Sequence, residues 1–431
     1  MLNKDKRNEI IALINREVVP AMGCTEPAAV SLAVAKATEV LGTVPEKIKV
    51  GLSSNMLKNA MGVGIPGTGM IGLPIAVALG ALIGRSEYGL EVLKDVTPEG
   101  VKRGREYIAE GRIDVNLLTD TPSNLHIDVE VTADGHTART VISQIHTNFV
   151  LISKDDEILL DNQDPSAQTG ASESKEEEVW LNMATVWDFA TESPLEEIRF
   201  ILKARDLNKA ASELGMKEDF GHSLGSTIRQ HGAKLFGEGH VAHMISATSA
   251  ACDARMGGAT VAVMSNSGSG NQGITATMPV VSYAEDINAT EEQLIRALAL
   301  SHLTSIYIKQ SLGRLSALCG CVVASTGASS AIVYLMGGGF EQVCSAVKNM
   351  VANLTGMICD GAKPSCSMKI SSGVSTALMS AMLAMNGKCV SSAEGIVHDD
   401  VDVTIHNLTS IGREAMSQTD LHVLDIMTNK C

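Results

Sequence analysis

The sequence predicts an α+β protein in which an N-terminal α/β region precedes a larger, mostly α-helical region. Strand-like alternation of apolar and polar residues is confined to the first 165 residues or so, whereas almost everything after residue 179 has helical periodicity. Between the two, the composition turns polar and acidic, with Pro and Gly, which is typical of a linker. We therefore predict regions at 1–165 and 179–431, joined by a linker at 166–178.

Length and composition bound the class of protein. A chain of 431 residues, 45% apolar and 19% charged, has room for two or three domains and is not disordered. The net charge is −15 and Lys and Arg form no cluster, so we expect neither a nucleic acid nor an anionic membrane as partner. The charged N-terminus lacks an apolar run, so we expect no secretory signal and a cytoplasmic protein.

Two uncharged stretches, 59–84 and 315–340, are each long enough to cross a bilayer. Both are rich in Gly, Ser and Thr rather than in Leu and Ile, and the first contains two prolines. We interpret them as buried helices and loops rather than membrane spans, so no membrane is expected.

The N-terminal elements can be placed in order. Apolar residues recur with helical spacing over residues 10–19, and Pro20 ends that helix. A second helix runs from Pro27 to Gly42, with Thr25 as its expected N-cap. Residues 47–52 alternate as a strand, and several further strands follow within 112–160, where Asp134–Gly135 is typical of a hairpin turn.

Nine cysteines in an acidic chain without a signal peptide do not indicate a disulfide framework. Cys319 and Cys321 lie in LCGC, and Cys359 and Cys366 flank a segment with Gly and Pro that indicates a loop. Three or four thiolates from two segments suit zinc or an iron–sulfur cluster. Alternatively, these cysteines are small apolar residues of a helical core.

Cys24 and His146 are separate candidates. Cys24 directly precedes a helix N-terminus, where thiols are acidified and reactive, although a buried small residue near a turn would look the same. His146 follows a predicted strand, beside Thr147 and Asn148, and is the histidine most expected to face a site.

Two glycine-rich segments, 62–67 and 268–273, match G-x-G-x-x-G. Neither has the context of a dinucleotide site, because Pro66 interrupts the first and Pro279 interrupts the helix expected after the second. Both segments fit tight turns. For the second we favour a nest of backbone N–H groups at Ser267–Asn271 that holds a small carboxylate.

Taken together, five segments closely resemble the L-cysteine desulfidases, oxygen-sensitive β-eliminating enzymes related to the iron–sulfur-dependent L-serine dehydratases. The matching segments are VVPAMGCTEPAAVSLA at 18–33, SSNMLKNAMGVGIPGTG at 53–69, SNSGSGNQG at 265–273, LCGC at 318–321 and MICDGAKPSCSMKISSG at 357–373. The resemblance covers the whole chain.

The resemblance implies a [4Fe–4S] cluster in the helical region, held by Cys319, Cys359 and Cys366, with Cys321 the other candidate for the first ligand. It implies that Cys24 is the base that removes the α-proton, and that a free iron binds the thiolate of L-cysteine. The expected products are sulfide, ammonia and pyruvate. The alternative is an L-serine dehydratase with the same cluster, and a homo-oligomer is compatible with either.

The resemblance and the loop compositions together also indicate a substrate site. The residues expected to meet the substrate are Thr25, Glu26, Asn59, His146, Ser267, Gly268, Ser269, Gly270 and Asn271.

Overall fold

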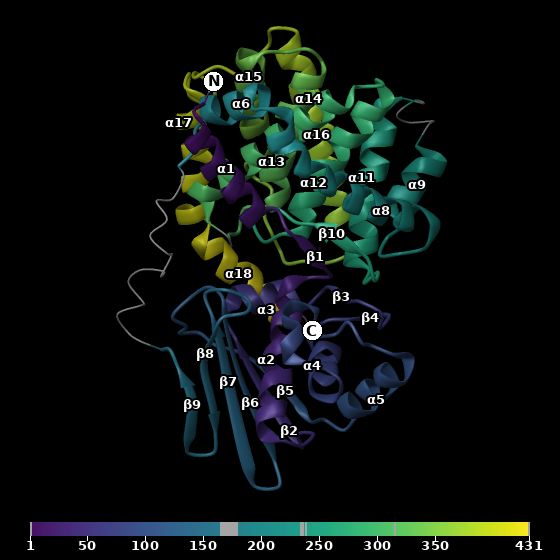
Figure 1. Cartoon of the computed structure of the whole chain (residues 1–431), viewed down its shortest axis with the longest axis vertical. Coiled ribbons are helices and arrows are strands. Elements are labelled where there is room, and N and C mark those ends of the chain that lie inside the picture. The colour runs from purple at the N-terminus through teal and green to yellow at the C-terminus, as the bar shows by residue number, and fades with distance from the viewer. Residues whose placement is uncertain (1, 164–179, 233–236, 238, 314–315, 430–431) are drawn as a thin grey trace.

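The computed structural model describes residues 2–163, 180–232, 237, 239–313 and 316–429. It is an α+β protein with the sheet at one end and the helical region at the other (Figure 1). The predicted fold class is therefore confirmed, while the predicted linker at 166–178 lies outside the described residues.

The elements before the linker are α1 (Lys4–Glu17), β1 (Pro20–Met22), α2 (Thr25–Leu41), β2 (Lys47–Leu52), α3 (Ser54–Ala60), β3 (Gly64–Ile65), β4 (Met70–Ile71), α4 (Leu73–Leu82), a 3₁₀ helix (Ser86–Glu91), α5 (Pro98–Ala109), β5 (Ile113–Leu117), β6 (His126–Ala133), β7 (His136–Ser143), β8 (Phe149–Lys154) and β9 (Glu157–Asp161). Those after it are α6 (Met183–Glu192), α7 (Leu195–Ile198), a 3₁₀ turn (Arg199–Ile201), α8 (Leu202–Lys217), α9 (Leu224–His231), α11 (His240–Met256), β10 (Ala262–Met264), α12 (Gly270–Asp286), α13 (Glu291–Leu312), α14 (Gly320–Leu335), α15 (Phe340–Leu354), α16 (Cys366–Met385), α17 (Val401–Ser410), a π turn (Ile411–Ala415) and α18 (Ser417–Thr428).

The main sheet has six strands in the order β5-β2-β6-β7-β8-β9. Only β2 and β5 pair in parallel, and the other neighbours are antiparallel. In β2 the apolar residues Ile48, Val50 and Leu52 are fully buried, as period-two alternation requires for a strand covered on one face. Helix α2 covers that face over β6 and β7, and the hydroxyl of Thr140 on β7 donates to the carbonyl of Ala33 on α2 at 2.9 Å.

The helical region is built around α11, α12, α13, α14 and α16, which pack on one another through small residues. Buried serines there donate to carbonyls of neighbouring helices, as Ser301 does to Ala276 at 2.6 Å and Ser329 to Ala377 at 2.8 Å. These hydrogen bonds satisfy the buried serine hydroxyls of helices that contain few charged residues. No helix among the described residues is long and apolar enough to span a membrane.

Two local expectations are corrected, and a third is confirmed. The helix α12 runs through Pro279 instead of ending before it. The residue that caps α2 is Cys24, and Thr25 is the first helical residue. The hairpin turn at Asp134–Gly135 forms as expected, with both residues at positive φ.

The terminal segments cross between the two regions. Helix α1 packs in the helical half, and β1 pairs antiparallel with β10 (Figure 1). Conversely, α18 packs against α3, where the buried ammonium of Lys58 forms an ion pair with Asp420. The start of α2, the start of α18 and the loops of the helical region are thereby brought to one junction.

Candidate active site

A cavity of about 780 Å³ lies at this junction. Segments far apart in the sequence form its wall: the start of α2, α3, the loops before β6 and after β7, the loop before α12, residues 316–321, residues 359–370 and α18. The predicted residues that line it are Cys24, Thr25, Glu26, Asn59, His146, Ser267, Gly268, Ser269, Asn271, Cys319, Cys359 and Cys366.

Cys24 is buried at the start of α2, and its thiol donates a hydrogen bond to the Glu26 carboxylate at 2.9 Å. Burial raises the pKa of Cys24 far above its usual value, the negative charge of Glu26 raises it further, and Arg255 opposes both. The thiol is therefore protonated in this structure. The acidification expected from the helix start is outweighed by burial and by the adjacent carboxylate.

Glu26 is a buried carboxylate surrounded by donors. Thr25 donates to its Oε2 at 3.1 Å and Asn59 to its Oε1 at 3.4 Å. Burial acts to raise the pKa of Glu26, but the charge of His146, the hydrogen bonds and the charge of Arg255 lower it overall. The carboxylate is thus ionised and accepts the hydrogen bond of the Cys24 thiol.

The loop before α12 makes a tight turn, with Ser267 and Gly268 both at positive φ. Asn266 stabilises this turn through hydrogen bonds. Its Oδ1 accepts from the Ser267 hydroxyl and from Gln272 Nε2, both at 2.9 Å. Its Nδ2 donates to the His302 carbonyl at 3.1 Å. Burial lowers the pKa of His302 to about 3, so this fully buried imidazole is neutral and supports the loop as a hydrogen-bonding group.

The cysteines of the helical region meet through a short antiparallel contact. Leu318 and Ile358 form an isolated β-bridge, and Cys319 and Cys359 each follow the bridged residue. Residues one step past a bridged pair lie on the same face of the two strands, so both thiols project from one side. Cys366 begins α16 on the same cavity wall.

The loop between Cys359 and Cys366 is fixed by a close approach. Gly361 has a φ of +88°, and a Cβ there would lie 2.3 Å from the carbonyl oxygen of Lys58. Only glycine fits both conditions. The loop is therefore pressed against α3, on the Cys24 side of the cavity.

The thiols are close enough to influence one another. Burial raises the pKa of Cys319 to about 12, with the charge of Cys359 adding to the effect and the Lys369 ammonium opposing it. Lys369 donates to the Ile358 carbonyl at 2.9 Å and pairs with Asp360. No group of three His, Cys, Asp or Glu side chains in the described part of the chain is spaced to hold a single metal ion. Three thiols on one wall, beside a lysine, are nevertheless the donors that an iron–sulfur cluster uses.

Comparison with known proteins identifies the family. A model described as the serine dehydratase alpha chain matches residues 87–425. The chain belongs to this family. It is 60% identical to a UPF0597 protein of Bacteroides fragilis over the whole of both chains. It is also 61% identical to one of Phocaeicola vulgatus, over all of this chain and 99% of that one, and 44% identical to one of Aeromonas hydrophila, over 99% and 97%.

The serine dehydratase alpha chain family comprises lyase-type enzymes and is associated with iron–sulfur clusters. This agrees with the kind of cavity described above, in which thiols and a buried carboxylate face the same space.

One predicted residue, Gly270, is not on the cavity wall. It is the first residue of α12, and a Cβ on it would lie 2.3 Å from Arg255 Nε. Cys321 does line the cavity, but its thiol donates to the Lys369 carbonyl at 3.1 Å and packs against Gly373.

Several lining residues were not predicted from the sequence: Asn55, Arg255, Gln272 and Lys369. Lys369 lies three residues after Cys366, and Gln272 lies within the glycine-rich segment 268–273, so their position in the sequence was an available signal. Arg255 lies at the end of α11 in a segment with no recognisable motif, so only the fold reveals it.

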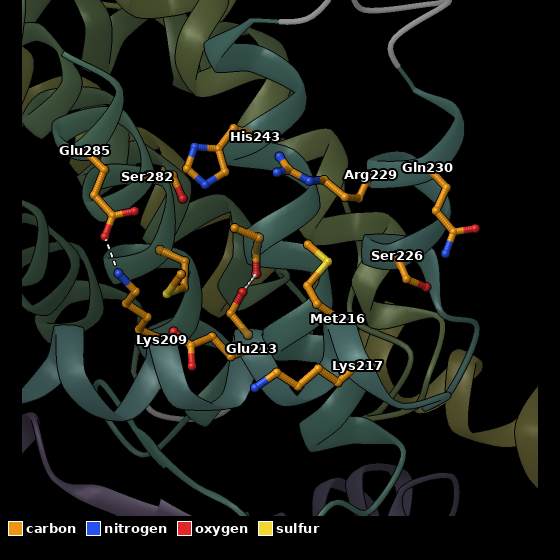
Figure 2. A pocket seen from close by; sticks show the side chains of 13 residues that line it. Lys209, Glu213, Met216, Lys217, Ser226, Arg229, Gln230, His243, Ser282 and Glu285 are labelled. Carbon is orange, nitrogen blue, oxygen red and sulfur yellow. Dashed lines mark hydrogen bonds and ion pairs between the residues drawn. The ribbon is translucent and has the colours of Figure 1, made fainter. Parts of the chain in front are cut away.

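A second, smaller cavity of about 350 Å³ lies among α8, α9, α11 and α12, away from these residues (Figure 2). Its wall includes Lys209, which pairs with Glu285 at 2.6 Å, and Arg229. None of the predicted site residues lines it.

Proposed function

We propose that this member of the serine dehydratase alpha chain family is an L-cysteine desulfidase, which eliminates sulfide from L-cysteine. The observation that carries the proposal is that Cys24 and the cysteines of the helical region, almost 300 residues apart in sequence, line one cavity. β-Elimination needs a base at Cα and assistance to the leaving group, and a cavity with a buried thiol–carboxylate pair on one side and further thiols on another offers both.

The proposed cofactor is a [4Fe–4S] cluster with Cys319, Cys359 and Cys366 as ligands. We choose Cys319 over Cys321 because Cys319 lies beside Cys359 at the Leu318–Ile358 bridge, whereas the Cys321 thiol packs against Gly373 of α16. Bound there, the cluster would supply a thiophilic Lewis acid to assist departure of the substrate sulfur. Lys369 would help to keep the ligands deprotonated, since its charge lowers the pKa of nearby thiols.

The proposed base is the thiolate of Cys24, which forms when the thiol loses its proton to solvent. Glu26 accepts the 2.9 Å hydrogen bond that orients this sulfur, and the thiolate takes the proton from Cα. As the C–S bond breaks, sulfide leaves and aminoacrylate forms. Aminoacrylate tautomerises to the imine, and water converts it to pyruvate and ammonia.

The alternative substrate is L-serine. The description of the family favours it, since serine dehydratases eliminate a hydroxyl from the same carbon. The two substrates differ in the leaving atom, and a soft sulfur binds a thiolate-ligated iron better than oxygen does. We therefore propose L-cysteine as the preferred substrate and L-serine as the second candidate.

The setting we propose is the reducing cytoplasm. The eight cysteines among the described residues are all free, as expected of a protein whose thiols serve chemistry rather than cross-linking.

The test is to purify the protein without oxygen, measure iron and acid-labile sulfide, and then assay release of pyruvate and sulfide from L-cysteine and L-serine in parallel. We expect an iron–sulfur protein with the higher kcat/KM for L-cysteine. A higher value for L-serine would support the alternative, and an iron-loaded protein that released pyruvate from neither would contradict both.

A further inference from the structure

Three buried polar atoms of residues that line the large cavity have no hydrogen-bond partner in the described part of the chain. They are Arg255 Nε, Asn55 Oδ1 and Gln272 Oε1, on side chains that are 3%, 6% and 1% exposed. Buried polar groups in native proteins are almost always satisfied, so unsatisfied ones in a cavity wall point to a missing ligand or water. One is a cationic donor and two are neutral acceptors.

Arg255 is held at the cavity wall by its surroundings. Its Nη1 donates to Asn271 Oδ1 at 3.0 Å, and its guanidinium lies so close to Gly270 that any Cβ there would collide with it. No ion pair with a carboxylate is formed by Arg255 within the described residues, although Glu26 lies near enough to be affected by its charge. A buried guanidinium without an ion-pair partner is a ready site for a carboxylate.

The loop before α12 has fewer free backbone N–H groups for binding an anion than the sequence predicted. In the predicted nest, the N–H of Ser267 is bonded to the Glu17 carbonyl at 2.8 Å and that of Ser269 to the Asn266 carbonyl at 3.0 Å. These groups cannot also bind an anion. A carboxylate in this part of the cavity would therefore depend on Arg255, supported by the start of α12.

The other two unsatisfied atoms, on Gln272 and Asn55, are acceptors and therefore suit a donor group. Gln272 donates through Nε2 to Asn266, which fixes its Oε1 as a free acceptor. Asn55 on α3 presents a second unsatisfied oxygen. Carbonyl oxygens of this kind match an ammonium group, which has donors only.

We propose that these residues form a zwitterion site, in which Arg255 binds the α-carboxylate of a free amino acid and Asn55 and Gln272 accept from its α-ammonium. The proposal rests on the proposed function and adds to it: the ligand is a free α-amino acid with both groups unblocked. Arg255, Asn55 and Gln272 are binding residues, and the cysteines act on the side chain of the same ligand.

The test uses the anaerobically purified protein and three probes. L-Alanine has both charged groups but no leaving group, so its binding is measured by calorimetry without turnover. Cysteamine lacks the carboxylate and 3-mercaptopropionate lacks the amine, and both are measured as competitive inhibitors of L-cysteine turnover.

For Arg255→Gln we expect L-alanine and 3-mercaptopropionate to bind about tenfold more weakly or worse, because a hydrogen bond to a charged group is lost, with cysteamine unchanged. For Gln272→Ala or Asn55→Ala we expect weaker L-alanine and cysteamine and unchanged 3-mercaptopropionate. Arg255→Lys should recover part of the loss. Arg229→Gln, which removes the same charge from the cavity of Figure 2, should change none of the three.

Other results would overturn the assignment. If Arg255→Gln weakened all three probes equally, its role would be structural, and if it weakened none, water rather than a ligand would satisfy the guanidinium. In either case, turnover of L-cysteine by the wild type would leave the proposed function standing. Should the Arg255 variants fail to fold, Gly270→Ala, which keeps the arginine but displaces its guanidinium, must reproduce the loss for L-alanine and 3-mercaptopropionate.

Discussion

The thiol of Cys24 donates a 2.9 Å hydrogen bond to the carboxylate of Glu26, two residues further along the chain. The first residue caps α2 and the second lies in its first turn, so the backbone of one helix start fixes both. Burial and this carboxylate keep the thiol protonated, while the carboxylate stays ionised. The pair is therefore a hydrogen-bond donor and acceptor already in contact.

Replacing Cys24 by Ala should leave iron content unchanged and abolish proton removal. General-base contributions are roughly 10²–10⁴-fold, so we expect a loss of that order in kcat for pyruvate release. The exposed Cys389 supplies the matched control, since Cys389→Ala removes a thiol outside the cavity. Normal turnover by Cys24→Ala would show that another group is the base.

Replacing Glu26 by Gln should move the rising limb of the pH–activity profile to lower pH. The negative charge of Glu26 raises the pKa of Cys24, so its removal favours the thiolate at lower pH. The profile of kcat/KM against pH measures this shift. Arg255→Gln should shift the same limb in the opposite direction, because Arg255 lowers that pKa; parallel shifts in the two variants would contradict this electrostatic account.

Replacing Cys359 or Cys366 by Ala should reduce iron and acid-labile sulfide to background, because a cluster with fewer thiolate ligands is not retained. Iron analysis and visible absorption of anaerobic protein provide the readout. The same measurements on Cys319→Ala and Cys321→Ala decide the first ligand: we expect loss of iron with the former only. Retention in Cys319→Ala and loss in Cys321→Ala would reverse that assignment.

Breaking the ion pair between Lys58 and Asp420 should destabilise the junction of the two regions. Lys58 is almost completely buried, so Lys58→Met leaves an uncompensated carboxylate and should cost about 3–5 kcal/mol of unfolding free energy. Urea denaturation measures this loss. The double variant Lys58→Met with Asp420→Leu should recover much of it, and equal losses in single and double variants would mean that the charge is not the cause.

His302 should make the wild type sensitive to acid. Its pKa is about 3 in the folded protein against 6.5 for a free imidazole, so the unfolded chain binds the extra proton. Its contribution is complete above pH 6.5 and falls by about 1.4 kcal/mol per pH unit as the pH drops towards 3. The urea midpoint should therefore fall less steeply with decreasing pH for His302→Gln than for the wild type. Identical slopes for the two proteins would refute the prediction.

Much of the fold was predictable because local patterns set it. The period of β2, the turn at Asp134–Gly135 and the glycine that ends α2 each act within a few residues. Pro279 was misjudged because a helix packed on all sides tolerates a proline that an isolated helix does not. Tertiary packing supplied the stability that local propensity lacks.

The sequence by itself determined the fold class, most of the elements, and the two groups of cysteines, because period, turn residues and motifs are local properties. It did not determine that Cys24 is protonated, that Arg255 Nε has no hydrogen-bond partner among the described residues, or that Gly270 accommodates the arginine rather than facing the cavity. Those features depend on burial and on charges brought together from distant segments. Desolvation and Coulomb energies are fixed by distance in space, and only the folded chain sets those distances.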